Sequence, residues 1–232
     1  MAKPKVSPAD QTELFATRTT RVLIVDDHAL VRDGLRLMFD QEPDLELCGE
    51  AADETEAVQV FRRAHPDVVI VDIGLKNGSG IEAIKRIKAH DLGARIIVAS
   101  MHDERVYGER ALQAGAMGFV SKQAPGGMLL TAIRQVMEGE LFFSEQLTQR
   151  ILRRAAGTSS PQSNSPVDQL ADRELEAFGL IGQGLTTRQI ASRMHISPKT
   201  VDRYRENIKR KLKLSTSNEL IHHATLWVEQ SR

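Results

Sequence analysis

The chain has 232 residues, which is enough for two ordinary domains. Its hydrophobic share of 41% and its charged share of 27% are typical of globular proteins. It has no apolar run long enough to span a membrane and no signal peptide, and its single cysteine, Cys48, excludes an internal disulfide framework and a clustered cysteine metal site. These features predict a cytoplasmic protein.

The formal net charge of zero hides an uneven distribution. Residues 168–232 carry 11 basic and 8 acidic side chains, whereas the rest of the chain carries 20 and 23. Within 188–213 there are nine basic and two acidic residues. A basic stretch of this density suits a polyanion such as nucleic acid, and the simpler alternative is a solvated helix face.

Strand and helix patterns alternate between residues 21 and 138. Short apolar runs predict strands at 21–25, 45–50, 68–71, 96–99 and 118–121. Helical periodicity predicts helices at 28–41, 54–64, around Ile81–Ile87, 103–114 and 126–138. Such alternation favours an α/β fold, a doubly wound (βα)5 parallel sheet of flavodoxin-like order with its site at the carboxyl ends of the strands.

Apolar side chains define the inner faces of the first and last of these helices. The first helix carries Leu30, Val31, Leu35 and Met38 on one face. The last helix is expected to bury Leu129, Leu130, Ile133, Val136 and Met137.

Composition divides the chain into four parts. Residues 1–20 are polar, contain two prolines and predict a flexible arm. The sequence GTSSPQSNSPV at 157–167 has the composition of a linker. After it the pattern is helical without a strand. We therefore expect an arm at 1–20, an α/β domain at 21–140, a linker at 141–167 and an all-α domain at 168–232.

Polar or charged side chains stand at the ends of four of the five predicted strands. Asp26 and Asp27 follow the first strand, Asp72 the third, Ser100 closes the fourth and Lys122 closes the fifth. The carboxyl ends of strands in a doubly wound sheet meet at one edge. Each of these residues alone is more often a cap or a solvated group, but five at matching strand ends indicate a site.

The chemistry of this set points to phosphoryl transfer. Three carboxylates held together repel one another and need a cation, and oxygen ligands without Cys or His favour Mg²⁺. Asp72 would be the nucleophile that forms an aspartyl-phosphate. Lys122 and Ser100 would supply the positive charge and the hydroxyl that developing phosphoryl charge requires.

Four segments carry a resemblance to the receiver domain of two-component response regulators, across about 21–140. They are VLIVDDH, VVIVDIGLKNGSGIEAI, IIVASMHDE and GAMGFVSK. The resemblance implies that Asp72 is the phosphoacceptor and that Asp26, Asp27 and the Gly74 carbonyl help it to bind Mg²⁺. It also implies that Ser100 is the switch hydroxyl, Phe119 the coupled aromatic residue and Lys122 the phosphate partner.

Two positions depart from the receiver pattern. Lys76 stands where receivers usually have proline, four residues after the acceptor, and Met101 stands where a small residue usually follows the switch hydroxyl.

The size of Met101 leads to a prediction about the lifetime of the phosphoryl group. If the side chain restricts access to the phosphate, Met101→Ala changes the rate of phosphorylation, of dephosphorylation or of both. Time courses with a small phosphodonor measure these rates, and two unchanged rates would contradict the hypothesis.

The second domain contains sequence signals for helix N-termini. Thr186 with Gln189 forms a capping box, and Ser197 followed by Pro198 is typical of an N-cap and first helical residue. Helices at 187–194 and 198–213, joined by a tight turn, predict a helix-turn-helix. A helix at about 171–181 precedes them, ended by the Gly182–Gly184 segment, and a fourth spans 217–229.

The 198–213 helix has two distinct faces. Its apolar face contains Val201, Tyr204, Ile208 and Leu212. Its polar face contains Lys199, Arg203, Glu206 and Arg210, flanked by Asp202 and Asn207. Such a helix fits the DNA major groove, although an ordinary surface helix has the same pattern.

The stretch ADRELEAFGLIGQGLTTRQIASRMHISPKTVDRYRENIKRKL resembles the LuxR-type output domain of NarL/FixJ-family regulators, over about 168–230. The resemblance implies base contacts by Asp202, Arg203 and Glu206. It implies backbone contacts by Lys199, Thr200, Lys209 and Arg210. It also implies double-stranded DNA and a histidine kinase as partners, small phosphodonors, and a homodimer formed on phosphorylation. Such regulators often hide the DNA-binding face against the receiver until then.

Two departures occur in this domain as well. Ala171 replaces the threonine that usually caps the first helix, so we expect Asp172 to serve in that turn at a cost of about 1 kcal/mol or less. Asp202 stands where many relatives have lysine, and a carboxylate can accept from cytosine N4 but is repelled by phosphate. The target sequence should therefore differ from theirs.

The sequence thus favours a response regulator that controls transcription and whose only catalysis is phosphorylation from a donor and slow self-dephosphorylation. A Mg²⁺-dependent phosphatase and an interaction module with a non-DNA partner are the alternatives. Helix 217–229, with Leu220, Ile221, Ala224 and Trp227 at helical spacing, is either a dimer surface or ordinary core.

Overall fold

The computed structural model describes residues 19–76, 78–156 and 166–230. The predicted flexible arm lies almost entirely outside these ranges, and so does most of the GTSSPQSNSPV segment. Within them, no helix combines the length and the apolar character that crossing a membrane requires.

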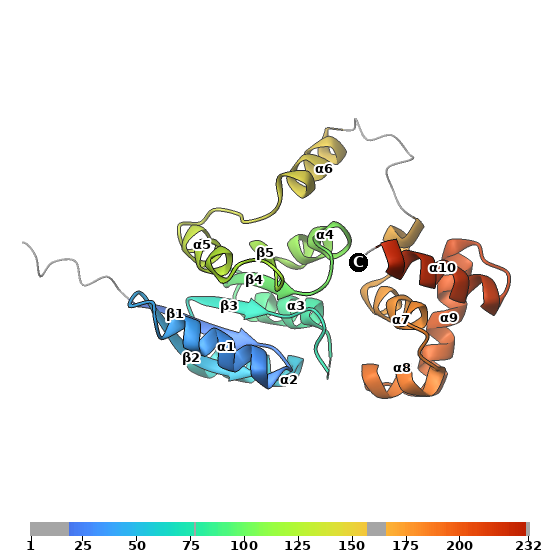
Figure 1. Ribbon diagram of the computed structural model, residues 1–232, viewed down its shortest axis with the longest axis horizontal. Helices are drawn as coiled ribbons and strands as arrows, with labels where there is room; N and C mark the ends of the chain where they lie inside the picture. Colours follow the sequence, from blue (N-terminus) through green and yellow to red (C-terminus); the bar gives the residue numbers. More distant parts are fainter. Residues whose placement is uncertain (1–18, 77, 157–165, 231–232) are drawn as a thin grey trace, which may run out of the picture.

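The first domain is built on a five-stranded parallel sheet (Figure 1). Its strands are β1 (Thr20–Val25), β2 (Leu45–Ala51), β3 (Val68–Val71), β4 (Arg95–Ser100) and β5 (Gly118–Ser121). Their order in the sheet is β2-β1-β3-β4-β5, which confirms the predicted doubly wound fold. The β-branched run of β3 is buried throughout, as a central strand covered on both faces requires.

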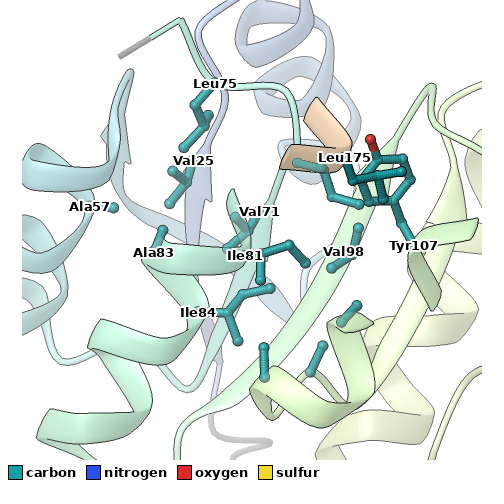
Figure 2. Close-up of a cluster of buried hydrophobic side chains, with 14 of the residues drawn as sticks. Val25, Ala57, Val71, Leu75, Ile81, Ala83, Ile84, Val98, Tyr107 and Leu175 are labelled. Atoms are coloured by element: carbon teal, nitrogen blue, oxygen red, sulfur yellow. The ribbon is translucent and has the colours of Figure 1, made fainter. Parts of the chain in front are cut away.

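Five helices cover the two faces of the sheet. They are α1 (Ala29–Phe39), α2 (Glu54–Ala64), α3 (Gly80–His90), α4 (Glu104–Ala114) and α5 (Gly126–Met137). One hydrophobic cluster joins α1 and α5 to the sheet, and a second joins α2, α3 and α4 to the other side. Figure 2 shows part of the second cluster, in which Ile81 and Ile84 of α3 face Val71 of β3.

Two expected apolar faces are less buried than their periodicity indicates. In α1 only Phe39 is fully buried, and Leu30 is 85% exposed. Leu30 lies in the first turn of α1, at the opposite end of the helix from the buried Phe39. In α5, Leu130 and Met137 are only partly buried.

A sixth helix, α6 (Glu145–Ala155), lies inside the predicted linker. Ser144 caps it by accepting from the Leu147 N–H at 3.3 Å, and Leu147 is its one buried residue. Leu147 packs over Gly108 of α4, where a Cβ would come within 2.6 Å of Leu147 Cδ2. Together with hydrogen bonds from Ser144 N–H to Glu104 at 2.9 Å and from Arg150 to the Arg105 carbonyl at 2.8 Å, this contact attaches the start of the connection to the first domain.

The second domain is all-helical, as predicted. After a short 3-10 turn, η3 (Pro166–Gln169), it contains α7 (Asp172–Gly182), α8 (Thr187–Met194), α9 (Pro198–Leu212) and α10 (Ser217–Gln230). Thr186 N donates to Gln189 Oε1 at 2.9 Å and Gln189 N donates to Thr186 Oγ1 at 3.4 Å, which confirms the capping box. Ser197 caps α9 with Pro198 as its first residue.

The expected role of Asp172 in capping α7 is wrong. Ala171 is the N-cap and has no side-chain acceptor, and Glu174 instead accepts from the Ala171 N–H at 2.9 Å. Burial alone would raise the pKa of Glu174, but the hydrogen bonds from Lys211 of α9 and from the Ala171 N–H lower it below its usual range. Asp172 is free to bind the first domain because Glu174 satisfies this turn.

The close crossing of α7 and α10 predicts a steric effect at Gly182. A Cβ there would lie 2.2 Å from the Ala224 carbonyl oxygen of α10, which is backbone and cannot rotate away. We expect Gly182→Ala to destabilise the second domain by about 2 kcal/mol or more.

Gly34, in the interior of α1, is the matched control because a Cβ there meets nothing within 4 Å. Gly34→Ala should stabilise the protein by about 0.4–1 kcal/mol. Urea unfolding followed by circular dichroism compares the two variants. An equal effect of both substitutions would contradict the described helix crossing.

Candidate functional site

Carboxylates from the ends of β1 and β3 converge at one edge of the sheet. Asp26, Asp27, His28 and Asp72 each offer one ligand atom, and these atoms all lie within 4.8 Å of one another. Asp26 is 2% exposed and Asp72 is 6% exposed. The structure therefore brings together the three carboxylates that were predicted to meet. It adds His28, whose adjacency to Asp27 was the only available signal.

Lys122 is the cation among these carboxylates. Its Nζ lies 2.6 Å from Asp26 Oδ2 and also forms a short contact with Asp72 Oδ2. Burial would lower the pKa of Lys122, but the charge of Asp72 and the hydrogen bonds to Asp26 and Asp72 raise it above its usual value. Lys122 is consequently held protonated, and it offsets only part of the negative charge.

Ser100 and Gly74 donate to the remaining oxygen of Asp72. Ser100 Oγ is fully buried and donates to Asp72 Oδ1 at 2.7 Å, and Gly74 N–H donates to the same oxygen at 3.3 Å. Phe119 is buried on β5 within the cluster beneath α3 and α4. All the predicted receiver-site residues thus lie at or beside the carboxyl edge of the sheet.

The backbone around Asp72 is tightly fixed. A Cβ at Gly80, the first residue of α3, would lie 2.0 Å from the Asp72 carbonyl oxygen. Only glycine therefore allows the start of α3 to approach the Asp72 backbone this closely. Asp72 N–H also donates to the Val25 carbonyl at 2.9 Å. These constraints fix the acceptor carboxylate relative to β1.

The donor set fits a hard divalent cation. Three carboxylates face one lysine, and the buried Asp27 Oδ1 contacts His28 Nδ1 at 2.8 Å but makes no well-oriented hydrogen bond with a residue that the structure describes. Oxygen-rich, negatively charged sites of this kind suit Mg²⁺. A cation here would reduce the repulsion between the carboxylates.

Lys76 and Met101, the two departures from the receiver pattern, both border the site. Met101 is 61% exposed and lines two cavities, one of about 620 Å³ that contains Asp72 and one of about 660 Å³ between the domains. Lys76 lines the second cavity.

The predicted DNA-reading face of α9 is open to solvent. Lys199, Asp202, Arg203, Glu206 and Arg210 are exposed, and the inner residues Val201 and Ile208 are buried. Thr200 and Lys209 are partly buried; Thr200 Oγ1 lies 2.9 Å from Ser197 Oγ, and Lys209 pairs with Glu206 at 2.8 Å. The resemblance implied a hidden face, whereas most of these α9 side chains are exposed, and described hydrogen bonds to the first domain come from α7 and from Asp168.

Both domains match known protein families. Residues 22–134 match the family model of the response regulator receiver domain, and residues 168–224 match bacterial regulatory proteins of the luxR family. The oxygen regulatory protein NreC of Staphylococcus carnosus (strain TM300) is 32% identical over 208 residues, covering 88% of this chain and 96% of that protein. NreC of Staphylococcus aureus (strain JH9) is 33% identical over 208 residues, with the same coverage.

Solved structures show the same likeness. A LuxR-family two-component response regulator from Aurantimonas sp. SI85-9A1 is 35% identical, with a TM-score of 0.55, and covers 60% of this chain and 99% of that one. RcsB from Salmonella enterica serovar Typhimurium, bound to promoter rprA with phosphomimetic BeF3⁻, is 25% identical with a TM-score of 0.62, covering 90% of this chain and 99% of that one.

A receiver domain followed by a luxR-type DNA-binding domain defines a response regulator of two-component signalling. The chain belongs to the NarL/FixJ family of these regulators, and it regulates transcription.

The position of Lys122 predicts how the domain responds to loss of this charge. Lys122→Met leaves buried carboxylates without their shared cation, so we expect a loss of about 3 kcal/mol of stability without Mg²⁺. Added Mg²⁺ should restore part of it, because the cation replaces the missing charge. Thermal unfolding with and without Mg²⁺ measures both effects.

Lys76→Met, at an exposed neighbour outside the ion pairs, is the control and should behave as wild type. A Lys122→Met protein as stable as this control in Mg²⁺-free buffer would contradict the electrostatic account of the site.

Proposed function

We propose that Asp72 accepts a phosphoryl group from a partner histidine kinase, and that this modification controls DNA binding through α9. One observation carries the proposal. The buried Asp72 carboxylate faces the Ser100 hydroxyl, the Lys122 ammonium and the Asp26 carboxylate from four different strand ends. Nucleophile, donors and metal-ligating oxygens are thus within reach of one phosphoryl position.

The reaction we propose is an in-line phosphoryl transfer. A carboxylate oxygen of Asp72 attacks the phosphorus of a phosphohistidine, the P–N bond breaks, and the imidazole leaves with its electron pair. With a small acyl phosphate donor, a P–O bond breaks instead. Lys122 and Ser100 donate to the phosphoryl oxygens as charge develops there. Water later attacks the aspartyl-phosphate, releasing inorganic phosphate and restoring the carboxylate.

The cofactor we propose is Mg²⁺, held by Asp26, Asp27, Asp72 and the Gly74 carbonyl. When bound, it neutralises charge on the phosphoryl oxygens. The three clustered carboxylates, which share the single lysine Lys122, support this assignment. A donor-driven phosphorylation and its slow reversal are the only catalysis we propose, in a protein located in the cytoplasm.

Ser100 and Phe119 are proposed to couple the site to the rest of the domain. Ser100 already donates to Asp72, and Phe119 is already buried. These positions support a switch in which the hydroxyl follows the phosphoryl group and the aromatic ring fills the space behind it.

For DNA, we propose base contacts by Asp202, Arg203 and Glu206. We propose backbone contacts by Lys199, Thr200, Lys209 and Arg210. The exposure of most of these side chains supports the assignment, and RcsB structures with promoters and as dimers on DNA support binding as a homodimer. The domains that carry these roles would be those at 21–140 and 168–232, joined by 141–167.

The proposal predicts different DNA occupancy for wild type and Asp72→Asn. The asparagine keeps the size of the side chain but cannot form the acyl phosphate, so we expect it to lose phosphodonor-induced occupancy of target promoters. Sequencing of genomic DNA bound by each protein measures this. Equal occupancy would contradict phosphorylation control and leave the DNA-binding assignment intact.

The salt dependence of complex formation distinguishes DNA binding from a role with another partner. The affinity for DNA should fall steeply as salt rises, because phosphate contacts release counterions. A gel shift over a salt series provides the measurement.

A further inference from the structure

The second domain is attached to the first through the start of α7. Asp172 accepts from Lys85 of α3 and from Arg110 of α4, both at 2.8 Å. Burial would raise the pKa of Asp172, but these two hydrogen bonds lower it below its usual range, so the carboxylate is ionised near neutral pH. Arg173 donates to the Gly78 carbonyl at 3.1 Å, in the loop that leads from β3 to α3.

This attachment brings the end of α8 to the acidic site. The cavity of about 620 Å³ that contains Asp72 is also lined by Ser100 and Lys122, and Arg193 of α8 is the one described residue of the second domain that lines it. Arg193 also lines the interdomain cavity of about 660 Å³ beside Asp27 and Gly74. A single guanidinium thus borders both spaces that open onto the site.

Arg193 is available for a ligand. Its side chain is exposed, and it makes no hydrogen bond or ion pair with another residue in the described part of the chain. Glu176 of α7, which lines the interdomain cavity with it, is a carboxylate on which its charge acts.

The electrostatic balance favours this guanidinium when a phosphoryl group is present. Lys122 already pairs with Asp26 and Asp72, so it cannot offset all the charge at this edge. A phosphoryl group carries roughly −1.5 to −2 charges and three acceptor oxygens. Arginine is suited to such oxygens because its planar fork donates to two of them at once.

We propose that Arg193 is a phosphoryl-binding residue supplied by the DNA-binding domain. Resting on the proposed role of Asp72, it extends the phosphorylation site across the domain boundary. In the docked arrangement Arg193 donates to an oxygen of the phosphoryl group on Asp72. The affinity of the site for the phosphoryl group then depends on whether the second domain is docked.

The test measures binding of beryllofluoride, a mimic of the phosphoryl group, to the full chain in Mg²⁺ by ¹⁹F NMR. We expect Arg193→Ala to weaken binding about two- to fivefold, the range of a partly solvated ion pair, and the difference to shrink at high salt. Arg193→Lys should retain part of the affinity. Arg188→Ala, an exposed arginine of the same helix that lines neither cavity, should bind as wild type.

Two further variants identify which claim fails if the result is negative. Asp72→Asn should bind no beryllofluoride; if it binds like wild type, the proposed acceptor is wrong. If Asp72→Asn abolishes binding but Arg193→Ala equals Arg188→Ala, only the role of Arg193 is overturned. Asp172→Ala loosens α7, so adding Arg193→Ala to it should have a smaller effect than in wild type. Simple additivity would contradict the dependence on docking.

Discussion

The crowding of negative charge at the carboxyl edge of the parallel sheet is the constraint on which the rest of this molecule depends. Asp26, Asp27 and Asp72 are brought together because β1 and β3 are hydrogen-bonded neighbours that end at the same level. Like charges this close in a partly dry site are costly unless a cation or a hydrogen bond compensates each of them. Lys122, Ser100 and the Gly74 N–H meet that need in part.

This incomplete compensation of the carboxylate charges is the basis of the proposed function. A site whose charges were fully paired would have no reason to bind a divalent cation or to respond to a phosphoryl group. Here the described partner of the buried Asp27 Oδ1 is the His28 imidazole, and Lys122 is shared between the other two carboxylates. The same edge of the sheet lines the cavities that α8 borders, which is why we propose that a change of charge at Asp72 acts on both domains.

Periodicity was sufficient to predict the fold, and strand ends were sufficient to predict that Asp26, Asp27, Asp72, Ser100 and Lys122 converge, whereas His28 was not predicted. The strand at Val68–Val71, the helix at Glu54–Ala64 and the capped helix at Thr187–Met194 have the predicted bounds, because each has a strong local signal. Helix α6 was missed although Leu147 and Ile151 have helical spacing, because most of its other residues are polar and the segment was assigned to the linker. Leu30 lies on the expected helical face but is exposed, and local sequence does not reveal which turns of a helix the rest of the fold covers.

The contacts between the domains were beyond local reasoning. A cap preference is a local property, so Asp172 was expected to serve its own helix. Its partners are 87 and 62 positions away, and only the folded chain places them beside it. The exposure of the α9 face has the same origin, since it depends on which helix of the second domain meets the receiver. The sequence identified the residue types, but it did not reveal how they pair across the domain boundary.

Direct identification of the phosphorylated residue tests the central claim. The full chain would be phosphorylated with a small phosphodonor in Mg²⁺, and the acyl phosphate would be reduced with borohydride, which converts a phosphorylated aspartate to homoserine. Peptide mass spectrometry then locates the product. The account predicts homoserine at position 72 and its absence when Mg²⁺ is removed. Homoserine at position 26 or 27, or labelling that is independent of Mg²⁺, would contradict it.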